Sequence, residues 1–278
     1  MYEDTLKPVH HCSLEYYLVG VVCLITFSLA GSESNSRELP SATSVLNRVI
    51  ERASQVARDD NSKKYCYEKR SLVEELDSGG KVVHSTEKKY KVVLVHGWPF
   101  SRLIQIQGQQ LSASEIQKED QREQEFRNKV AGRDLQKRRE KKEALIRPEL
   151  IDRYDFSVVS NSVCQHRETL VLEFKPKPGQ PDDTLQDRIY NRVAGLLWVD
   201  KEDGEVAKLD VHLTEDFSLG WLGMLGSLKK CDLTLQRGRM PDGVWVNTKQ
   251  IVLIVGRKVL STMRYRTTDE SSDFHHEQ

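Results

Sequence analysis

The stretch KCDLTLQRGRMPDGVWVNTKQIVLIVGRKVLSTMRYRTTDE, residues 230–270, decides the fold. Its residues Met240 to Gly243 (MPDG) have the composition of a tight turn, and Gly256 marks a second break. The stretch therefore predicts three successive strands. Strands that follow one another through short turns pair antiparallel, because a parallel neighbour needs a long crossover. An antiparallel meander is expected here.

The same organisation extends upstream. Residues 64–77 and 81–97 are two long strand candidates joined by SGGK, a hairpin signal at residues 78–81. The segment FSRLIQIQGQQLS, residues 100–112, predicts a short third strand with a turn at Gly108. These segments predict a second set of antiparallel strands in the first half of the chain.

A third group follows Pro148. Residues 154–163 and 167–179 form a predicted antiparallel pair, and residues 194–215 form a hairpin that turns at Gly204. Alternation puts Val206, Leu209, Val211 and Leu213 on one face, with a slip near Ala207. We therefore expect an α+β protein built on a large curved antiparallel β-sheet, with helices on one of its faces.

Two longer helices are predicted besides a short helical segment at residues 183–193. Residues 40–60 form an amphipathic helix, since Val45, Leu46, Val49, Ile50, Ala53 and Val56 recur at helical spacing. From Ser112 to about Leu145 the chain is strongly charged, and Ser112 with Glu115 makes a capping box. This segment has too few apolar residues to pack a full helix face. We therefore predict a projecting, solvated helix within an insertion over residues 112–147.

Composition limits the function classes. The chain has 278 residues, of which 38% are hydrophobic and 30% charged, and its formal net charge is zero. That length is enough for one large domain or two small ones, and we treat residues 32–278 as a single β-rich domain. A neutral chain gives no electrostatic argument for a nucleic-acid partner, so none is expected.

The N-terminal segment YYLVGVVCLITFSLAGS, residues 16–32, is apolar and ends in small residues. Ser28 and Ala30 stand at the −3 and −1 positions of a signal-peptidase site. Residues 1–31 are therefore interpreted as a signal peptide, with an uncleaved membrane anchor or a buried helix as the alternatives. This reading predicts an exported protein of the bacterial periplasm or cell envelope.

Cysteines occur at positions 12, 23, 66, 164 and 231. Three remain if cleavage follows Ala30, and an odd number cannot all pair within the chain. We expect small buried hydrophobic residues rather than a disulfide framework, and no metal-ligand spacing is present. No cofactor or metal is predicted. The pair His275-His276 is assigned to a solvated terminal tail.

The run VVLVHGWPFSRLI, residues 92–104, resembles the strand and oxyanion loop of α/β-hydrolases. Such an enzyme needs a nucleophile in G-x-S-x-G, and none follows Gly97. It also needs alternating strands and helices. We interpret His96-Gly97 as the end of a strand, and we expect a protein that is not an enzyme.

The order of these phrases is similar to the outer-membrane lipoprotein-sorting (LolA/LolB-like) superfamily, in its uncharacterised bacterial envelope branch. The resemblance is carried by YEKR…EELDSGGKVVHSTEKKYKVV, GWPFSRLIQIQGQQLSASE and LWVDKEDGEVAKLDVHL, and extends over about residues 41–271. It implies an unclosed antiparallel β-barrel wrapped round helices, with an apolar cavity for acyl chains. The charged helix is an addition to that pattern, and no residue can be matched to the ligand handling of the classical carriers.

Composition alone suggests where an apolar ligand would lie. The candidate ligand-binding residues are Trp198, Phe217, Leu219, Trp221, Leu222, Met224, Leu225 and Trp245. The alternative is that all eight are ordinary core between the sheet and its helices.

Three hypotheses for function follow. The first is an envelope protein that binds or carries a lipid, an acyl chain or a lipidated protein. The second is a protein-interaction or stress-sensing module that docks an envelope partner through the charged helix or a sheet edge. The third, least favoured, is a hydrolase.

Overall fold

The structure, a computed structural model, describes residues 39–59, 65–131, 152–219, 226–258 and 261–276. Its helices are α2 (Ala42–Asp59), α3 (Ala113–Val130) and α6 (Leu185–Tyr190). Its strands are β1 (Tyr65–Leu76), β2 (Val82–Val95), β3 (Trp98–Ile106), β4 (Gln109–Gln110), β5 (Tyr154–Cys164), β6 (Arg167–Pro176), β7 (Val193–Asp200), β8 (Val206–Leu213), β9 (Phe217–Leu219), β10 (Gly226–Arg239), β11 (Trp245–Lys258) and β12 (Ser261–His276).

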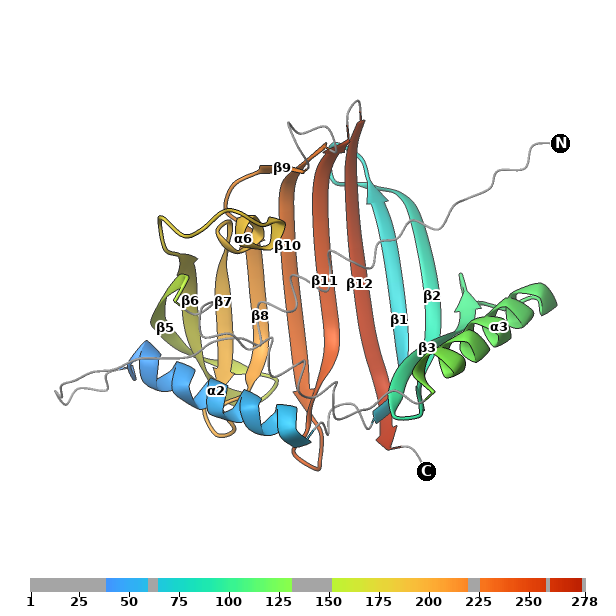
Figure 1. The fold of residues 1–278 in the computed structure, drawn as a ribbon, viewed down its shortest axis with the longest axis horizontal. Helices are drawn as coiled ribbons and strands as arrows, with labels where there is room; N and C mark the ends of the chain where they lie inside the picture. Colours follow the sequence, from blue (N-terminus) through green and yellow to red (C-terminus); the bar gives the residue numbers. More distant parts are fainter. Residues whose placement is uncertain (1–38, 60–64, 132–151, 220–225, 259–260, 277–278) are drawn as a thin grey trace.

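All these strands form one sheet, and every pairing in it is antiparallel. The order is β4-β3-β2-β1-β12-β11-β10-β8-β7-β6-β5, and β9 pairs with β10 beside this path. Strand β1 pairs with β12, so the first and last of the described strands lie side by side in the middle of the sheet (Figure 1). The path ends at β4 and β5 without closing. The predicted unclosed antiparallel sheet is confirmed, and with it the rejection of a hydrolase sheet.

Tight turns explain the meander. His96 and Gly97 both have positive φ, at 50° and 73°, and form the two-residue connection between β2 and β3. This is the backbone that a hairpin of matching twist requires. The MPDG turn after β10 is confirmed, with Gly243 at φ 85° donating its N–H to the Met240 carbonyl. Gly256 was wrongly given a break, because β11 runs through it to Lys258.

The predicted slip near Ala207 has a structural counterpart. Trp198 is opposite Lys208, whereas the next residue, Val199, is opposite Val206. Ala207 is therefore the extra residue of a β-bulge, which restores the inward direction of the side chains on both sides of it. Alternation read from the sequence detected the bulge as a break in period.

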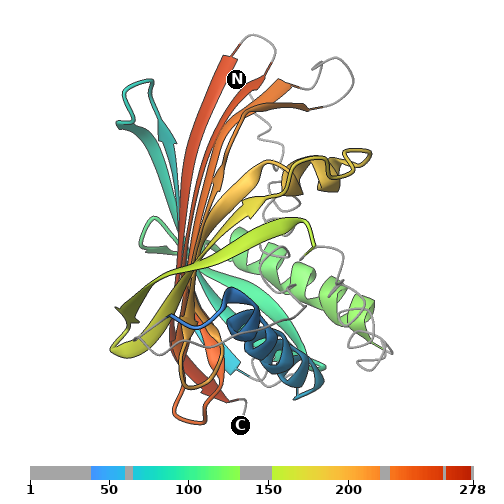
Figure 2. The same ribbon diagram turned by 90° about the vertical axis from the view of Figure 1, so that its left-hand side faces the viewer.

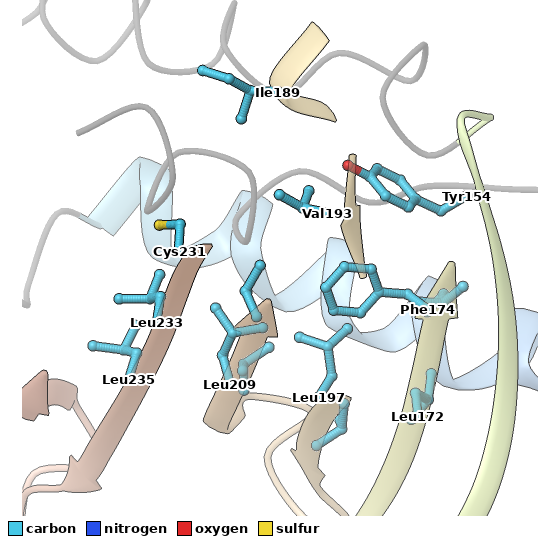
Figure 3. Packing of buried hydrophobic residues seen from close by; sticks show 14 of the residues in the cluster. Tyr154, Leu172, Phe174, Ile189, Val193, Leu197, Leu209, Cys231, Leu233 and Leu235 are labelled. Carbon is cyan, nitrogen blue, oxygen red and sulfur yellow. The ribbon is translucent and has the colours of Figure 1, made fainter. Parts of the chain in front are cut away.

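The main core lies between one face of the sheet and helix α2. Val45 and Leu46 of α2 are buried, and Val49 and Ile50 pack beside them. Their partners are Leu172 and Phe174 of β6, Leu197 of β7, Leu209 of β8, and Leu233 and Leu235 of β10. Figure 3 shows these strand side chains gathered in one layer, with Ile189 of α6 at its rim.

Helix α3 begins with the predicted capping box, in which Ser112 accepts from the Glu115 N–H and Glu115 accepts from the Ser112 N–H. The second half of the predicted charged helix, from residue 132, lies outside the described residues. Phe126 and Val130 pack against Phe100 of β3, so this part of the helix does not project freely.

His275 and His276 were wrongly assigned to a tail, since both belong to β12. The ring of His276 packs on Tyr65 with 4.3 Å between centroids, and its Nε2 lies 3.2 Å from Asp242 Oδ2. Cys66 and Cys231 are buried and Cys164 is half-buried, and no disulfide joins these three described cysteines. Among the described helices, none is long and apolar enough to cross a membrane.

Candidate functional site

The strand register shows which side chains share the face that α2 covers. Leu233 of the core is opposite Val252 of β11, and Val252 is opposite Thr267 of β12. Thr267 is in turn opposite Val73 of β1, and Val73 is opposite Thr86 of β2. These residues therefore lie on one continuous face, which we call the concave face because the sheet curves towards α2 (Figure 2).

Only part of the concave face is covered by the described helices. Helices α2 and α6 lie over the part formed by β5, β6, β7, β8 and β10, and neither extends across β12, β1 and β2 (Figure 1). Val252 at the border is 3% exposed, whereas Val73 and Met263 further along are each 37% exposed. The part formed by β11, β12, β1 and β2 is the candidate site, and we call it the open floor.

The open floor changes from apolar to polar along its strands. On the apolar side lie Ile254, Met263, Tyr265 and Val73, with Ile254 directly opposite Tyr265. On the polar side lie Lys69, Ser71, Thr267, Asp269 and Ser271. Met263 and Asp269 are six positions apart along β12, which at the ordinary rise of a strand is about 20 Å.

An ion pair occupies the polar side of the open floor. Lys69 Nζ lies 2.5 Å from Asp269 Oδ2, and the two side chains are only 31% and 16% exposed. The other oxygen of the carboxylate, Oδ1, is buried and has no hydrogen-bond donor among the described residues. Such an acceptor is costly unless a donor reaches it from outside these residues.

Tyrosines border this pair. Tyr90 of β2 is directly opposite Lys69, and Tyr67 is two residues from Lys69 along β1. Burial raises the pKa of Tyr67, with Lys69 lowering it and Asp269 raising it by a smaller amount. Burial also raises the pKa of Tyr90. Both phenols stay neutral at physiological pH, so each offers a hydroxyl group that can donate or accept.

Helix α2 is fixed over its half of the concave face by an ion pair and a hydrogen bond to the loop between β7 and β8. Glu205 is 6% exposed and forms two ion pairs. Its Oε1 lies 3.1 Å from Arg52 Nε of α2, and its Oε2 lies 2.7 Å from Arg237 Nη1 of β10. Arg48 of α2 donates to the Lys201 carbonyl at 2.7 Å. The helix therefore cannot shift along the sheet without breaking these contacts.

Helix α3 lies on the other side of the sheet, contrary to the expectation that the helices share one face. Phe100 of β3 is opposite Val93 of β2, and Val93 alternates with Val92 and the concave residues before it. Side chains of α3 also close the edge of β3. Glu119 Oε2 accepts from the Leu103 N–H at 3.0 Å, and Arg122 donates to the Ser101 carbonyl.

Of the eight predicted ligand residues, the structure describes the side chains of two, Trp198 and Trp245. Trp198 alternates with the core residue Leu197, and Lys208 Nζ lies 4.2 Å from its ring centroid on the convex face. Trp245 is 3% exposed and donates its Nε1–H to Asp203 Oδ2 at 2.8 Å. Trp221, Leu222, Met224 and Leu225 lie outside the described residues, as do the side chains of Phe217 and Leu219. Their role in binding stays a prediction.

Sequence reasoning missed the residues of the open floor. Lys69, Tyr90 and Asp269 read as ordinary alternation in polar strands, and only the order of strands in the sheet places them side by side. The one sequence signal for this site is a tyrosine on each of two polar strands, Tyr67 on β1 and Tyr90 on β2. Among the described residues, no group of three or more His, Cys, Asp or Glu side chains could hold a metal ion.

Neither a family model nor a curated protein matches the sequence. Solved structures are similar at low identity. A DUF1329 family protein from Desulfovibrio piger is 13% identical with a TM-score of 0.30, covering 81% of this chain and 90% of its own. A LolA superfamily protein from Nitrosomonas europaea is 12% identical with a TM-score of 0.28, covering 86% and 95%. The complex of MucA and MucB from Pseudomonas aeruginosa is 12% identical with a TM-score of 0.24, covering 84% of this chain and 98% of its own.

The superfamily that the sequence resembles is therefore also found among the similar solved structures. At TM-scores of this size, the description of the fold rests on the strand pairing within the chain.

Proposed function

We propose that this chain is a non-enzymatic binding protein of the bacterial envelope whose open floor holds an acyl chain, from a lipid or a lipidated protein. The observation that carries the proposal is the partial cover of the concave face. Side chains of α2 fill it over β5 to β10, while the floor over β11, β12, β1 and β2 stays half-exposed and grades from apolar to polar.

The apolar side suits the tail of the ligand. Ile254, Met263, Tyr265 and Val73 continue the core surface beyond the reach of α2. Each methylene group that they remove from water contributes about 0.8 kcal/mol. One acyl chain spans one leaflet, which is half of the roughly 30 Å hydrocarbon core of a bilayer. The distance of about 20 Å along β12 is longer than that span.

The polar side suits the head of the ligand. Lys69 would pair with a carboxylate or phosphate, and Tyr67 and Tyr90 would supply hydroxyl groups next to it. A hydroxyl or amide of the head group could donate to the unpaired Oδ1 of Asp269. Partial burial strengthens the hydrogen bonds and ion pairs of these polar groups, because fewer water molecules compete for them.

The export of the chain and the cleavage of residues 1–31 belong to this proposal and rest on the sequence alone. Docking of an envelope partner is the second candidate function. The exposed edge of β5 suits such docking better than α3 does. The inward side of α3 is already engaged by β3 through Phe100 and Arg102.

A binding titration tests the proposal. The purified chain is titrated with a fluorescent fatty acid, and lipid that copurifies is identified by mass spectrometry. Saturable binding of one probe per chain, displaced by unlabelled fatty acid, is expected. A chain that neither copurifies with lipid nor binds the probe contradicts the proposal.

A further inference from the structure

Strand β5 forms an edge of the sheet, and on its outer side no described strand or helix pairs with it (Figure 2). It is 11 residues long, and Asp155 is its single charged residue. Val159 is 46% exposed and Val163 is 68% exposed. Long, apolar and nearly uncharged edges are what proteins ordinarily avoid, because they offer a template for another strand.

Two hydrogen bonds show which backbone groups of β5 face outward. The Lys201 N–H donates to the Glu168 carbonyl, so Glu168 bonds towards β7 and its opposite residue on β5, Val163, bonds away from β6. The Lys177 N–H donates to the Arg153 carbonyl, so Arg153 bonds towards β6. Alternation from these two points, allowing for the bulge at Val159, leaves the outward groups on Tyr154, Phe156, Val158, Asn161 and Val163.

Four of these residues, Phe156, Val158, Asn161 and Val163, are symmetric about the bulge. If a second copy of β5 lies antiparallel beside the first, Phe156 meets Val163 of the second copy and Val158 meets Asn161 of the second copy. The outward groups of these four residues then face one another, Tyr154 lies beyond the paired segment, and the bulges of both copies lie at the two-fold axis. We propose that two copies of this chain pair through β5 in this register, which joins their sheets into one.

A second copy fits better than other occupants because the opposite edge offers little open backbone: its outermost strand β4 has two residues, and α3 covers part of β3 beside it. Glu119 and Arg122 of α3 occupy the backbone groups of Leu103 and Ser101 on β3. Pairing through β5 therefore stops at two chains, whereas two open edges would lead to a fibre. The register sets no like charges opposite each other, since Asp155 faces Cys164 of the second copy.

That last pair supplies a test that depends on the register. Asp155 and Cys164 bond towards β6, so across the proposed interface they are a non-hydrogen-bonded pair with Cα atoms about 4.5 Å apart. This spacing allows a disulfide. With Cys12 and Cys23 replaced by Ser throughout, Asp155→Cys should form a disulfide-linked dimer under mild oxidation. Alkaline pH is used because burial raises the pKa of the Cys164 thiol.

Matched controls make the result specific. Adding Cys164→Ser to Asp155→Cys should abolish the cross-link, because two cysteines at position 155 do not face each other. Ser157→Cys, two residues along the same face, should cross-link at least fivefold less. Cross-linking that survives Cys164→Ser, or equal cross-linking from position 157, overturns the register.

The association itself is measured by light scattering coupled to size-exclusion chromatography. The full chain should be dimeric at micromolar concentration. Val163→Pro removes an outward N–H without touching the ladder to β6, so it should raise the dimer Kd at least tenfold. Val163→Thr keeps that N–H and should stay dimeric. A monomeric full chain, as expected if a different protein occupies the edge, overturns the proposal, as does a Val163→Pro variant that remains dimeric.

Discussion

Lys69 and Asp269 meet 2.5 Å apart on the concave face of the sheet, although they come from strands at opposite ends of the described chain. Their meeting depends on β1 entering the sheet beside β12. The pair puts a cation and a half-satisfied carboxylate beside two neutral tyrosines, on a surface that no described helix covers. This is why we assign the head group of a ligand to this place.

Lys69→Gln should weaken binding of a fatty acid about tenfold, which is about 1.4 kcal/mol, because it removes the cation that faces the carboxylate. Binding of an uncharged acyl probe, such as a monoacylglycerol with the same chain, should change less than twofold. Titration of both probes on the same variant checks this. An equal loss for both would show that Lys69 supports the fold of the floor and does not bind the head group.

Glu205→Ala should destabilise the chain by about 3 kcal/mol. The substitution leaves Arg237 with little exposure and without its carboxylate partner, and it also releases Arg52 of α2. Urea denaturation measures the loss. Glu202→Ala, in the same loop, removes a carboxylate that is 78% exposed and should cost less than about 0.5 kcal/mol. Similar losses in both variants would contradict the role of Glu205 in fixing α2.

Glu119→Ala should cost about 1–3 kcal/mol, because it leaves the Leu103 N–H at the edge of β3 without its acceptor. Glu125→Ala, on the same helix but exposed, should be nearly neutral. The Glu119→Ala variant should also aggregate faster on mild heating, because the uncovered backbone of β3 can then pair with another strand. Unchanged stability and aggregation would remove the assigned role of α3.

Acid should destabilise the chain partly through Asp200. Burial raises the pKa of its carboxyl, but hydrogen bonds from the Arg167 guanidinium and from the Asp203 and Glu202 N–H groups outweigh burial and hold the pKa below 3.8. Since the folded pKa lies below the unfolded one, its stabilisation is complete above about pH 4 and is lost as pH falls through the folded pKa.

Asp200→Asn should therefore be less stable than the parent at pH 7, and the difference should shrink below pH 4. Urea midpoints measured between pH 2 and pH 7 check this. A constant difference across that range would mean that the carboxyl does not titrate in step with folding.

Much of the fold could be predicted because strand signals and turn signals agree locally. The MPDG turn, the two residues His96-Gly97 and the slip at Ala207 each follow from backbone demands that a few residues reveal. Gly256 misled the prediction because glycine in a strand also serves close packing, and here a Cβ would approach the Ser227 carbonyl at 3.3 Å. The side of the sheet that α3 occupies depends on the packing of Phe126 and Val130 against Phe100, a contact between distant parts of the sequence that no local pattern encodes.

The candidate site was less predictable than the fold. Of the tryptophans predicted to bind a ligand, Trp198 lies on the convex face and Trp245 donates to Asp203, as amphipathic rings do when a polar partner is near, and Trp221 lies outside the described residues. The open floor instead consists of residues that look like solvated strand positions, such as Lys69 and Thr267. Their common face depends on β1 pairing with β12, which are separated by almost the whole described chain.

The most direct test of the central claim compares the two faces of one strand. Val73 is 37% exposed on the open floor, and its neighbour Leu72 points to the opposite face. Titration with a fluorescent fatty acid should show at least tenfold weaker binding to Val73→Glu and unchanged binding to Leu72→Glu, with both variants folded by circular dichroism. Equal affinity in the two variants, or a loss confined to Leu72→Glu, would contradict binding on the concave face.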